Sequence, residues 1–269
     1  MKQYHRVLTI AGSDSGGGAG IQADLKTISA CGCFGTSAIT AITAQNTVGV
    51  SDIHPVPIST LEAQIRAVLD DIGADAVKLG MLHSVEVIDC VARLLSDYHI
   101  TNIVLDPVMV ATSGDKLIEG DGVTALQEIL FPLARLITPN IPEAEIICGN
   151  AVSEKSELGA IARQLGEKYN FSVLAKGGHL NETTLEDVLY DNETGRLASF
   201  SNPKQETNNT HGTGCTLSSA LASFLARDFS VIEATEEAID YVAGAIKSGG
   251  KYSIGSGHGP VHHFHCFWQ

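Results

Sequence analysis

One short glycine turn late in the chain carries the residues best suited to chemistry. It runs Asn208-Asn209-Thr210-His211-Gly212-Thr213-Gly214-Cys215-Thr216 and leads directly into Leu217–Leu225, an apolar run that indicates a buried helix. A glycine turn at a helix start leaves several backbone N–H groups unpaired, and they point to one place beside the positive end of the helix dipole. The stretch therefore predicts an anion pocket at residues 212–215.

A thiol lies beside this predicted pocket. Cys215 falls at the start of the expected helix. A thiol at a helix N-terminus is shifted from a free pKa of about 8.5 toward the thiolate. We therefore expect either a base next to the anion pocket or, on the alternative interpretation, a glycine turn before a core helix in which Cys215 only packs.

The elements that must position this turn are short apolar strands that alternate with helices. Strands are expected at 6–11, 36–45, 76–82, 103–110, 136–140 and 172–176, and helices at 21–30, 59–72, 85–95, 157–168, 216–226 and 232–247. Such alternation predicts a mainly parallel central sheet with helices on both faces. Residues 188–200, which turn at 191–195, instead predict an edge β-hairpin. No linker or repeat interrupts the pattern, so residues 1–269 are interpreted as one domain.

Polar and glycine residues gather where these strands end. They are Gly12, Asp14, Gln45, Met81, Asp106, Asn140, Glu143, Lys176 and residues 212–215. Ligands bind at the carboxyl ends of the strands in parallel sheets, so this shared position predicts one site. Gln45 closes an apolar strand, where its amide can read the donor and acceptor edge of a heterocycle or simply begin a solvated loop.

The first strand runs into a glycine loop, Gly12-Ser13-Asp14-Ser15-Gly16-Gly17-Gly18-Ala19-Gly20. The dinucleotide fingerprint fails because Ile21 stands where its third glycine belongs, and no Gly-Lys-Ser/Thr occurs in the chain. The loop either lets a ligand approach the backbone or forms a tight turn. Asp24, on the first turn of the following helix, can accept a hydrogen bond from a ligand or complement the helix dipole.

The charged residues point to phosphoryl transfer. Asp106 and Glu143 can hold Mg²⁺ directly or through water, or they are solvated loop carboxylates. Lys176 can supply positive charge to a phosphate. A helix terminus contributes only ~0.3–1 kcal/mol at exposed sites, whereas catalysis needs at least about 8 kcal/mol. The turn must therefore work with a metal, a cation and enforced proximity, which is a phosphoryl-transfer arrangement without a Walker loop.

Composition excludes several classes of partner. The formal net charge is −14 and the pI is about 5.0, which argues against a nucleic-acid partner. The apolar run Val7–Ile10 is too short for a signal peptide, and no stretch approaches the ~18 apolar residues of a membrane helix. The six cysteines form no CxxC pair, which suits free thiols in a reducing cytoplasm.

Taken together, several segments resemble one family from end to end. They are residues 11–24, 44–46, 78–81, 106–109, 138–140 with Glu143, 176–179, 210–216 and 259–265. The chain resembles the ribokinase-like kinases, and within them the hydroxymethylpyrimidine/phosphomethylpyrimidine kinases of thiamine biosynthesis. The resemblance implies a three-layer ribokinase-like fold. It also implies ATP-dependent phosphorylation of 4-amino-5-hydroxymethyl-2-methylpyrimidine and then of its monophosphate, in a homodimer.

The resemblance also implies roles for individual residues. The pyrimidine site would be lined by Gly12, Gln45, Met81 and Val108, with Asp24 nearby, and Asp106 and Glu143 would serve Mg²⁺. The residues toward the ATP phosphates would be Asn140, Lys176, Thr210 and Thr213. Catalysis would rest on Gly212, Gly214 and Cys215, where Cys215 either deprotonates or positions the attacking hydroxyl, or only packs beside the anion hole.

Two departures from similar sequences concern phosphate-reaching positions. Many relatives carry Lys where this chain has Thr112 and Ser256. These differences bear on how the monophosphate is held for the second step. Residues 112–116 are expected to form a flap over the substrate.

Other functions stay open at this point. A pyridoxal or pyridoxine kinase belongs to the same superfamily. A Cys-nucleophile hydrolase would pair Cys215 with His211 or His179, and a non-catalytic pyrimidine sensor would use the pocket alone. The histidine-rich tail at 262–266 resembles a metal site, but adjacent histidines on a strand point to opposite faces.

Overall fold

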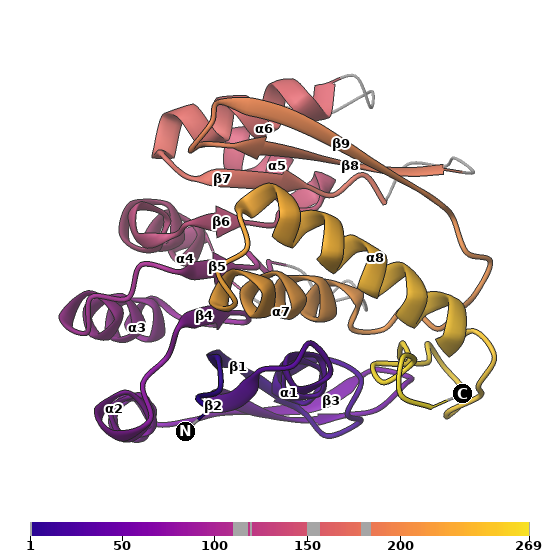
Figure 1. Ribbon diagram of the computed structural model, residues 1–269. Coiled ribbons are helices and arrows are strands. Elements are labelled where there is room, and N and C mark those ends of the chain that lie inside the picture. Colours follow the sequence, from indigo (N-terminus) through magenta and orange to yellow (C-terminus); the bar gives the residue numbers. More distant parts are fainter. Residues whose placement is uncertain (1, 110–117, 119, 150–156, 179–183, 269) are drawn as a thin grey trace.

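The computed structural model describes residues 2–109, 118, 120–149, 157–178 and 184–268. Within these residues the chain forms a nine-stranded sheet in the order β3-β2-β1-β4-β5-β6-β7-β8-β9, with helices on both faces (Figure 1). The strands are β1 (Arg6–Asp14), β2 (Phe34–Gln45), β3 (Val50–Pro55), β4 (Ala76–Leu79), β5 (Ile103–Leu105), β6 (Leu136–Ile137), β7 (Ser172–Ala175), β8 (Thr184–Asp191) and β9 (Arg196–Pro203). The strands from β2 to β7 pair in parallel, while β3 at one edge and the β8–β9 hairpin at the other are antiparallel.

The helices divide into two layers. One layer contains α1 (Gly20–Ala30), α7 (Thr213–Ala226) and α8 (Val231–Gly249). The other contains α2 (Ile58–Asp71), α3 (Val85–Asp97), α4 (Gly120–Ala125), α5 (Ile141–Cys148) and α6 (Leu158–Tyr169), with a π-helical turn at Leu126–Leu130 and a 3₁₀ turn at Phe131–Leu133. None of the helices in the described residues is long and apolar enough to cross a membrane.

Each layer buries its own apolar cluster against the sheet. Leu217, Leu221 and Phe224 of α7 belong to one cluster, and Ile65 of α2 and Leu94 of α3 belong to the other. Strands covered on both faces are predominantly apolar, which is why β4, β5 and β7 contain no alternating polar face. The three-layer α/β fold with an edge hairpin is confirmed.

The structure also differs from the expected elements. Helix α7 begins at Thr213 rather than at residue 216, so Gly214 and Cys215 belong to its first turn. Strand β1 extends to Asp14 through an irregularity around Gly12. Strand β3 was not expected, because most of its residues are exposed and it lacks an apolar face.

Candidate active site

The first turn of α7 meets two loops of the sheet. Gly212 precedes α7 with a positive φ of 80°, and a Cβ there would lie 1.8 Å from the carbonyl oxygen of Gly18. A Cβ on Gly214 would lie 3.3 Å from Asp106 Oδ2 and 3.8 Å from Lys176 Nζ. Helix geometry leaves the amides of this first turn without intrahelical partners. The glycine turn therefore brings free N–H groups, a carboxylate and an ammonium group to one place.

The carboxylates and the lysine form a buried charged cluster. Lys176 Nζ donates to Asp106 Oδ1 at 3.1 Å, and the Thr138 hydroxyl donates to the same oxygen at 3.0 Å. Glu143 is 4% exposed, and burial raises its pKa to about 7, with Lys176 lowering it and the charge of Asp106 raising it further. Burial disfavours the charged form of Lys176, but Asp106 and Glu143 outweigh it and raise the pKa of that lysine.

Helix α5 places Glu143 through a reciprocal cap. The Asn140 side chain accepts from the Glu143 N–H at 2.9 Å, and the Glu143 carboxylate accepts from the Asn140 N–H at 2.8 Å. Asn140 also forms a bridge with Lys176 beyond the end of β6. Two buried carboxylates with a shared excess of negative charge are hard oxygen donors, so Asp106 and Glu143 fit Mg²⁺.

Cys215 does not have the lowered pKa that its position suggested. It is partly exposed in the first turn of α7, yet burial raises the pKa of the thiol to about 11. The positive charge of Lys78 lowers it, but Asp24 and Asp106 act in the opposite direction. The expectation of a thiolate is therefore wrong, because desolvation and two nearby carboxylates outweigh the helix terminus.

A buried ion pair that sequence reasoning missed lies beneath this turn. Lys78 on β4 donates to both carboxylate oxygens of Asp24 at 3.0 and 2.9 Å. Thr9 of β1 donates to the same carboxylate at 2.6 Å, and Ser219 of α7 at 2.8 Å. Asp24 is fully buried, and it lies in the second turn of α1 rather than the first. This corrects the expectation that Asp24 accepts from a ligand or complements the helix dipole. A lysine inside a four-residue apolar strand was the signal for a buried partner.

The residues expected around the pyrimidine lie at adjacent strand ends. A Cβ on Gly12 would lie 2.6 Å from Met81 Cε, so these two residues are in contact, and Thr40 holds the Met81 carbonyl at 2.9 Å. Val108 is partly exposed in the loop after β5, the strand next to β4. Gln45 ends β2 and is partly exposed.

An aspartate and a histidine join the glycine loop to the α7 turn. The Asp14 carboxylate accepts from the N–H groups of Gly16, Gly18 and Ala19, and it lies 3.0 Å from His211 Nε2. Burial opposes the charged form of Asp14, but the hydrogen bonds from His211, Ala19 and Gly16 outweigh it and lower the pKa of this carboxyl. Sequence reasoning had assigned His211 only to a hydrolase.

The hydrolase pairing has no support in these contacts. In the part of the chain that the structure describes, no hydrogen bond joins the Cys215 thiol to a histidine, and His211 Nε2 is directed to Asp14. His179 and the expected flap at 112–116, with Thr112, lie outside the described residues. Ser256 is exposed, and its neighbour Gly257 donates to the Thr47 hydroxyl at 3.3 Å.

The two threonines expected near ATP flank the turn. Thr210 is exposed, and its carbonyl accepts from the Thr213 N–H at 3.3 Å. The tail packs against the same helix, where His263 Nε2 lies 3.3 Å from Thr216 Oγ1. The groups expected to bind phosphate are thus supported from the C-terminal end of the chain.

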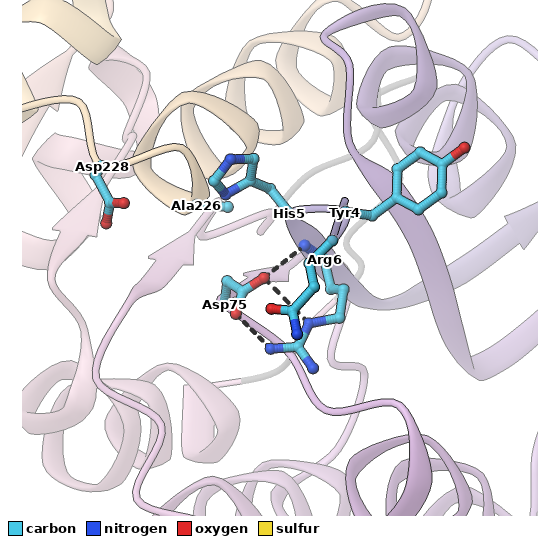
Figure 2. Close-up of a pocket in the computed structure, with 7 residues that line it drawn as sticks. Tyr4, His5, Arg6, Asp75, Ala226 and Asp228 are labelled. Atoms are coloured by element: carbon cyan, nitrogen blue, oxygen red, sulfur yellow. Dashed lines mark hydrogen bonds and ion pairs between the residues drawn. The ribbon is translucent and has the colours of Figure 1, made fainter. Parts of the chain in front are cut away.

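A separate hollow lies at the opposite end of the sheet. This pocket has a volume of about 390 Å³ and is lined by Gln3, Tyr4, His5, Arg6, Asp75, Ala226 and Asp228. Figure 2 shows Tyr4, His5 and Arg6 beside Asp75, Ala226 and Asp228. Arg6 begins β1, so this pocket faces the amino end of that strand. The Arg6 guanidinium is already paired with Asp75 at 2.6 Å. The pocket therefore lies away from the strand ends that carry the candidate site.

The fold and the site together define a class of protein. A nine-stranded three-layer α/β sheet, an unpaired helix start and a lysine–carboxylate cluster at the strand ends are the features of a ribokinase-like kinase. The family model described as phosphomethylpyrimidine kinase matches residues 14–262. The chain belongs to the phosphomethylpyrimidine kinase family.

Individual relatives agree with this assignment. The chain is 47% identical over 268 residues to a hydroxymethylpyrimidine/phosphomethylpyrimidine kinase of Haemophilus influenzae, with 98% of each chain covered. Its structure is similar to the phosphomethylpyrimidine kinase of Clostridium difficile 630, with a TM-score of 0.79, 41% identity, and coverage of 90% of this chain and 99% of that one. It is also similar to an ADP complex of Bacillus subtilis pyridoxal kinase, with a TM-score of 0.88, 35% identity, and coverage of 97% and 98%.

Proposed function

We propose that the chain transfers a phosphoryl group from ATP to the hydroxyl of 4-amino-5-hydroxymethyl-2-methylpyrimidine, and then phosphorylates the resulting monophosphate. The observation that carries this proposal is the approach of Gly214 to Asp106 and Lys176. Backbone donors, an ammonium group and carboxylates then surround one anion, which is the arrangement that phosphoryl transfer needs. Family membership supplies the substrate class.

Some residues are assigned to neutralise the charge of the phosphates, and others are assigned to hold ATP and the substrate in place. The amides of Gly214 and Cys215 hold the transferring phosphoryl group, and Lys176, which follows β7, balances its charge. Asn140, Thr210 and Thr213 are assigned to the ATP phosphates. Asp106 and Glu143 would hold Mg²⁺, which supplies charge neutralisation between the phosphates when bound. Gly12, Gln45, Met81 and Val108 are assigned to the ring of the substrate.

Cys215 acts on the attacking hydroxyl as a thiol rather than as a preformed thiolate. Its pKa of about 11 leaves the sulfur protonated at neutral pH. We assign it to orient the hydroxyl through a hydrogen bond. The hydroxyl loses its own proton late in the reaction, to a phosphate oxygen or to water, as its oxygen bonds to phosphorus. Cys215→Ala is expected to lower kcat by about 10²-fold, because misplacing a reacting group by about 1 Å can cost that much.

The matching control is the rate of thiol alkylation. The rate at which iodoacetamide modifies Cys215 should increase with pH up to about pH 11. Peptide mapping measures this rate, and the exposed Cys266 is the internal reference. A loss of less than about threefold in kcat for Cys215→Ala would show that the thiol only packs beside the turn, since a group that positions the reacting hydroxyl contributes about 10²-fold.

The assay that tests the whole proposal measures ADP release with ATP and Mg²⁺. Parallel reactions contain hydroxymethylpyrimidine, its monophosphate or pyridoxine. Turnover on both pyrimidines is expected. Turnover on pyridoxine alone would move the chain to vitamin B6 phosphorylation, an activity favoured by the TM-score of 0.88 to a pyridoxal kinase. Absence of ADP in every reaction would overturn the kinase assignment.

We further propose that residues 1–269 form one cytoplasmic domain that assembles as a homodimer. The sheet runs without a break in strand order from β3 to β9, and the six cysteines are free, which suits a reducing compartment. The dimer follows from the family resemblance, and light scattering after size-exclusion chromatography tests it. A mass of one chain at micromolar concentration would overturn it.

A further inference from the structure

The terminal amide of Gln45 lies between a threonine and a histidine. Thr43 Oγ1 is 3.1 Å from the atom placed as Gln45 Oε1, and His211 Nε2 is 3.4 Å from the atom placed as Gln45 Nε2. An amide turned by half a revolution about its last bond exchanges its oxygen, an acceptor, with its nitrogen, a donor. The neighbours of Gln45 therefore decide which atom faces which side.

Thr43 selects the nitrogen. Its hydroxyl lies 2.8 Å from the carbonyl oxygen of Ser13. A carbonyl only accepts, and a hydroxyl has a single proton, so that proton is committed to Ser13. Thr43 Oγ1 can then only accept from Gln45, and the atom of the amide that faces it must be the nitrogen.

His211 selects the oxygen by an independent route. Its Nε2 is 3.0 Å from Asp14 Oδ2. Asp14 also accepts three backbone N–H groups, which favour its ionised form, and an ionised carboxylate can only accept. His211 Nε2 must therefore carry a proton. If the Gln45 amide nitrogen faced His211 Nε2–H, two donors would face each other and no hydrogen bond could form. The amide oxygen, which accepts, therefore belongs on the His211 side.

We propose that Thr43 and His211 are positioning residues that hold the Gln45 amide in a single orientation, and that this orientation decides which way round the substrate ring binds. The inference rests on the proposed function, in which Gln45 reads the pyrimidine. In the orientation we propose, which is the placed amide turned by half a revolution, the oxygen is on the His211 side and the nitrogen is on the Thr43 side. Its outer edge keeps one free lone pair and one free N–H, a matched acceptor and donor.

This edge complements a 4-aminopyrimidine in one direction only. The exocyclic amine donates to the amide oxygen on the His211 side, and ring nitrogen N3 accepts from the amide N–H on the Thr43 side. The hydroxymethyl group is on C5, the carbon beyond the one that bears the amine. It is therefore directed past His211 toward Gly212 and the α7 turn. The reversed amide would direct the same hydroxyl away from that turn.

The same edge discriminates against a ring with exchanged donors and acceptors. In 5-hydroxymethyl-2-methylpyrimidin-4-one the C4 oxygen accepts and N3–H donates, so both pairs face like groups. A site built around defined hydrogen bonds rejects a mismatched ligand strongly, because its polar groups are left unpaired. We expect wild-type kcat/KM to favour the 4-amino ring over the 4-oxo ring by at least about 10²-fold.

The test compares this ratio among variants of β2. Thr43→Val keeps the shape of the side chain but cannot accept a hydrogen bond, so the amide can reverse. The ratio is expected to fall by at least ~10-fold, with KM for ATP little changed, since about 1.4 kcal/mol corresponds to a factor of ten. Thr43→Ser should restore the ratio. Thr36→Val is the matched control, because the Thr36 hydroxyl donates to the Val7 carbonyl at the other end of β2.

Two further variants separate the possible failures. His211→Phe removes the donor at the other end of the amide and should also lower the ratio, so the result does not depend on one variant folding. A ratio unchanged in Thr43→Val and His211→Phe, but lost in Gln45→Ala, would overturn the positioning role alone. A ratio unchanged in Gln45→Ala would remove Gln45 from the pyrimidine site, and absence of wild-type turnover would remove the proposed function itself.

Discussion

The charges closest to the α7 turn are arranged as pairs. Lys78 lies wholly inside the protein, and its ammonium group is matched by Asp24, which is itself held by Thr9 and Ser219. Burial opposes the charge of Lys78, but the negative charge of Asp24 outweighs it and raises the pKa of this lysine. The pair ties β1, β4, α1 and α7 to one point below the site. We therefore expect it to matter for stability more than any surface ion pair.

Lys78→Met should be strongly destabilising. It leaves the Asp24 carboxylate buried without its counter-charge, and breaking such a pair costs about 3–5 kcal/mol in free energy of unfolding. Urea unfolding at neutral pH measures the loss, with the exposed Lys204→Met as the matched control. The double variant Lys78→Met with Asp24→Leu should lose less than the single variant. A single variant as stable as the control would show that the pair is not structural.

At the scale of the element, the first turn of α7 depends on two glycines for different reasons. Gly212 has a φ of 80° and no room for a Cβ against the Gly18 carbonyl. Gly214 has helical backbone, and its absent Cβ leaves space beside Asp106 and Lys176. The first glycine is therefore required by the fold of the turn, and the second leaves open the space where we propose that the anion binds.

Alanine at each position should separate these roles. Gly212→Ala is expected to lower stability by about 2 kcal/mol or more, from a left-handed backbone and a backbone clash. Gly214→Ala should leave stability unchanged or slightly higher, because alanine favours a helix by roughly 0.5–1 kcal/mol, while kcat falls at least ~10-fold as the methyl group enters the anion site. Thermal unfolding and steady-state kinetics give the two readouts. A fully active Gly214→Ala would place the transferring group elsewhere.

Sequence reasoning located this turn but not its exact start. The apolar run after residue 216 predicted the helix body, while two glycines concealed a first turn that begins at Thr213. Strand β3 escaped prediction because its pairing with β2 lies outside the covered part of the sheet, where no apolar pattern is required. Hydrophobic periodicity identifies elements that are buried, and exposed elements leave a weaker signal.

At the scale of the whole molecule, the tail packs against the start of α7 through His263. Thr216 donates its hydroxyl proton to the Gly212 carbonyl at 2.8 Å, so His263 Nε2 must donate to Thr216. Burial lowers the pKa of His263 to about 3, with Lys26 and His262 adding to the effect. The imidazole is therefore a neutral structural donor rather than a metal ligand held ready at the surface.

This histidine should contribute to loss of stability in acid. Unfolding exposes an imidazole with a pKa near 6.5, whereas the folded protein keeps it neutral down to about pH 3. Below about pH 6.5 the unfolded state binds a proton at this imidazole and the folded state does not. The free energy of unfolding therefore falls by roughly 2 kcal/mol between pH 6.5 and 5 from this group alone.

The variant His263→Gln keeps an N–H donor and removes the titration. Urea midpoints at pH 7.5, 6.5 and 5 should decline less steeply in this variant than in the wild type. Parallel slopes for the two proteins would show that His263 does not carry this acid sensitivity.

The sequence predicts that the site residues lie together at one edge of the sheet. It does not predict the hydrogen bonds and charge interactions between them. Parallel strands with polar residues at their ends bring Asp106, Glu143 and Lys176 together whatever the side-chain details. The pairing of Asp14 with His211 joins residues 197 positions apart, and no local pattern encodes it. The raised pKa of Cys215 depends on burial and on two distant carboxylates, which only the folded chain reveals.

Two parts of the proposed site lie far apart in the sequence. Gly12 and Gln45, which are assigned to the substrate ring, precede β4, whereas the α7 turn and the bridge between His211 and Pro260 follow β9. A chain still attached to the ribosome can pair β1, β2 and β4 before α7, the helix whose start is proposed to receive the phosphoryl group, has been synthesised. On the proposed function, a chain that stops before α7 has part of the ring site and lacks the turn that takes the phosphoryl group. Catalysis is therefore expected only once α7 has been synthesised and has packed onto the sheet.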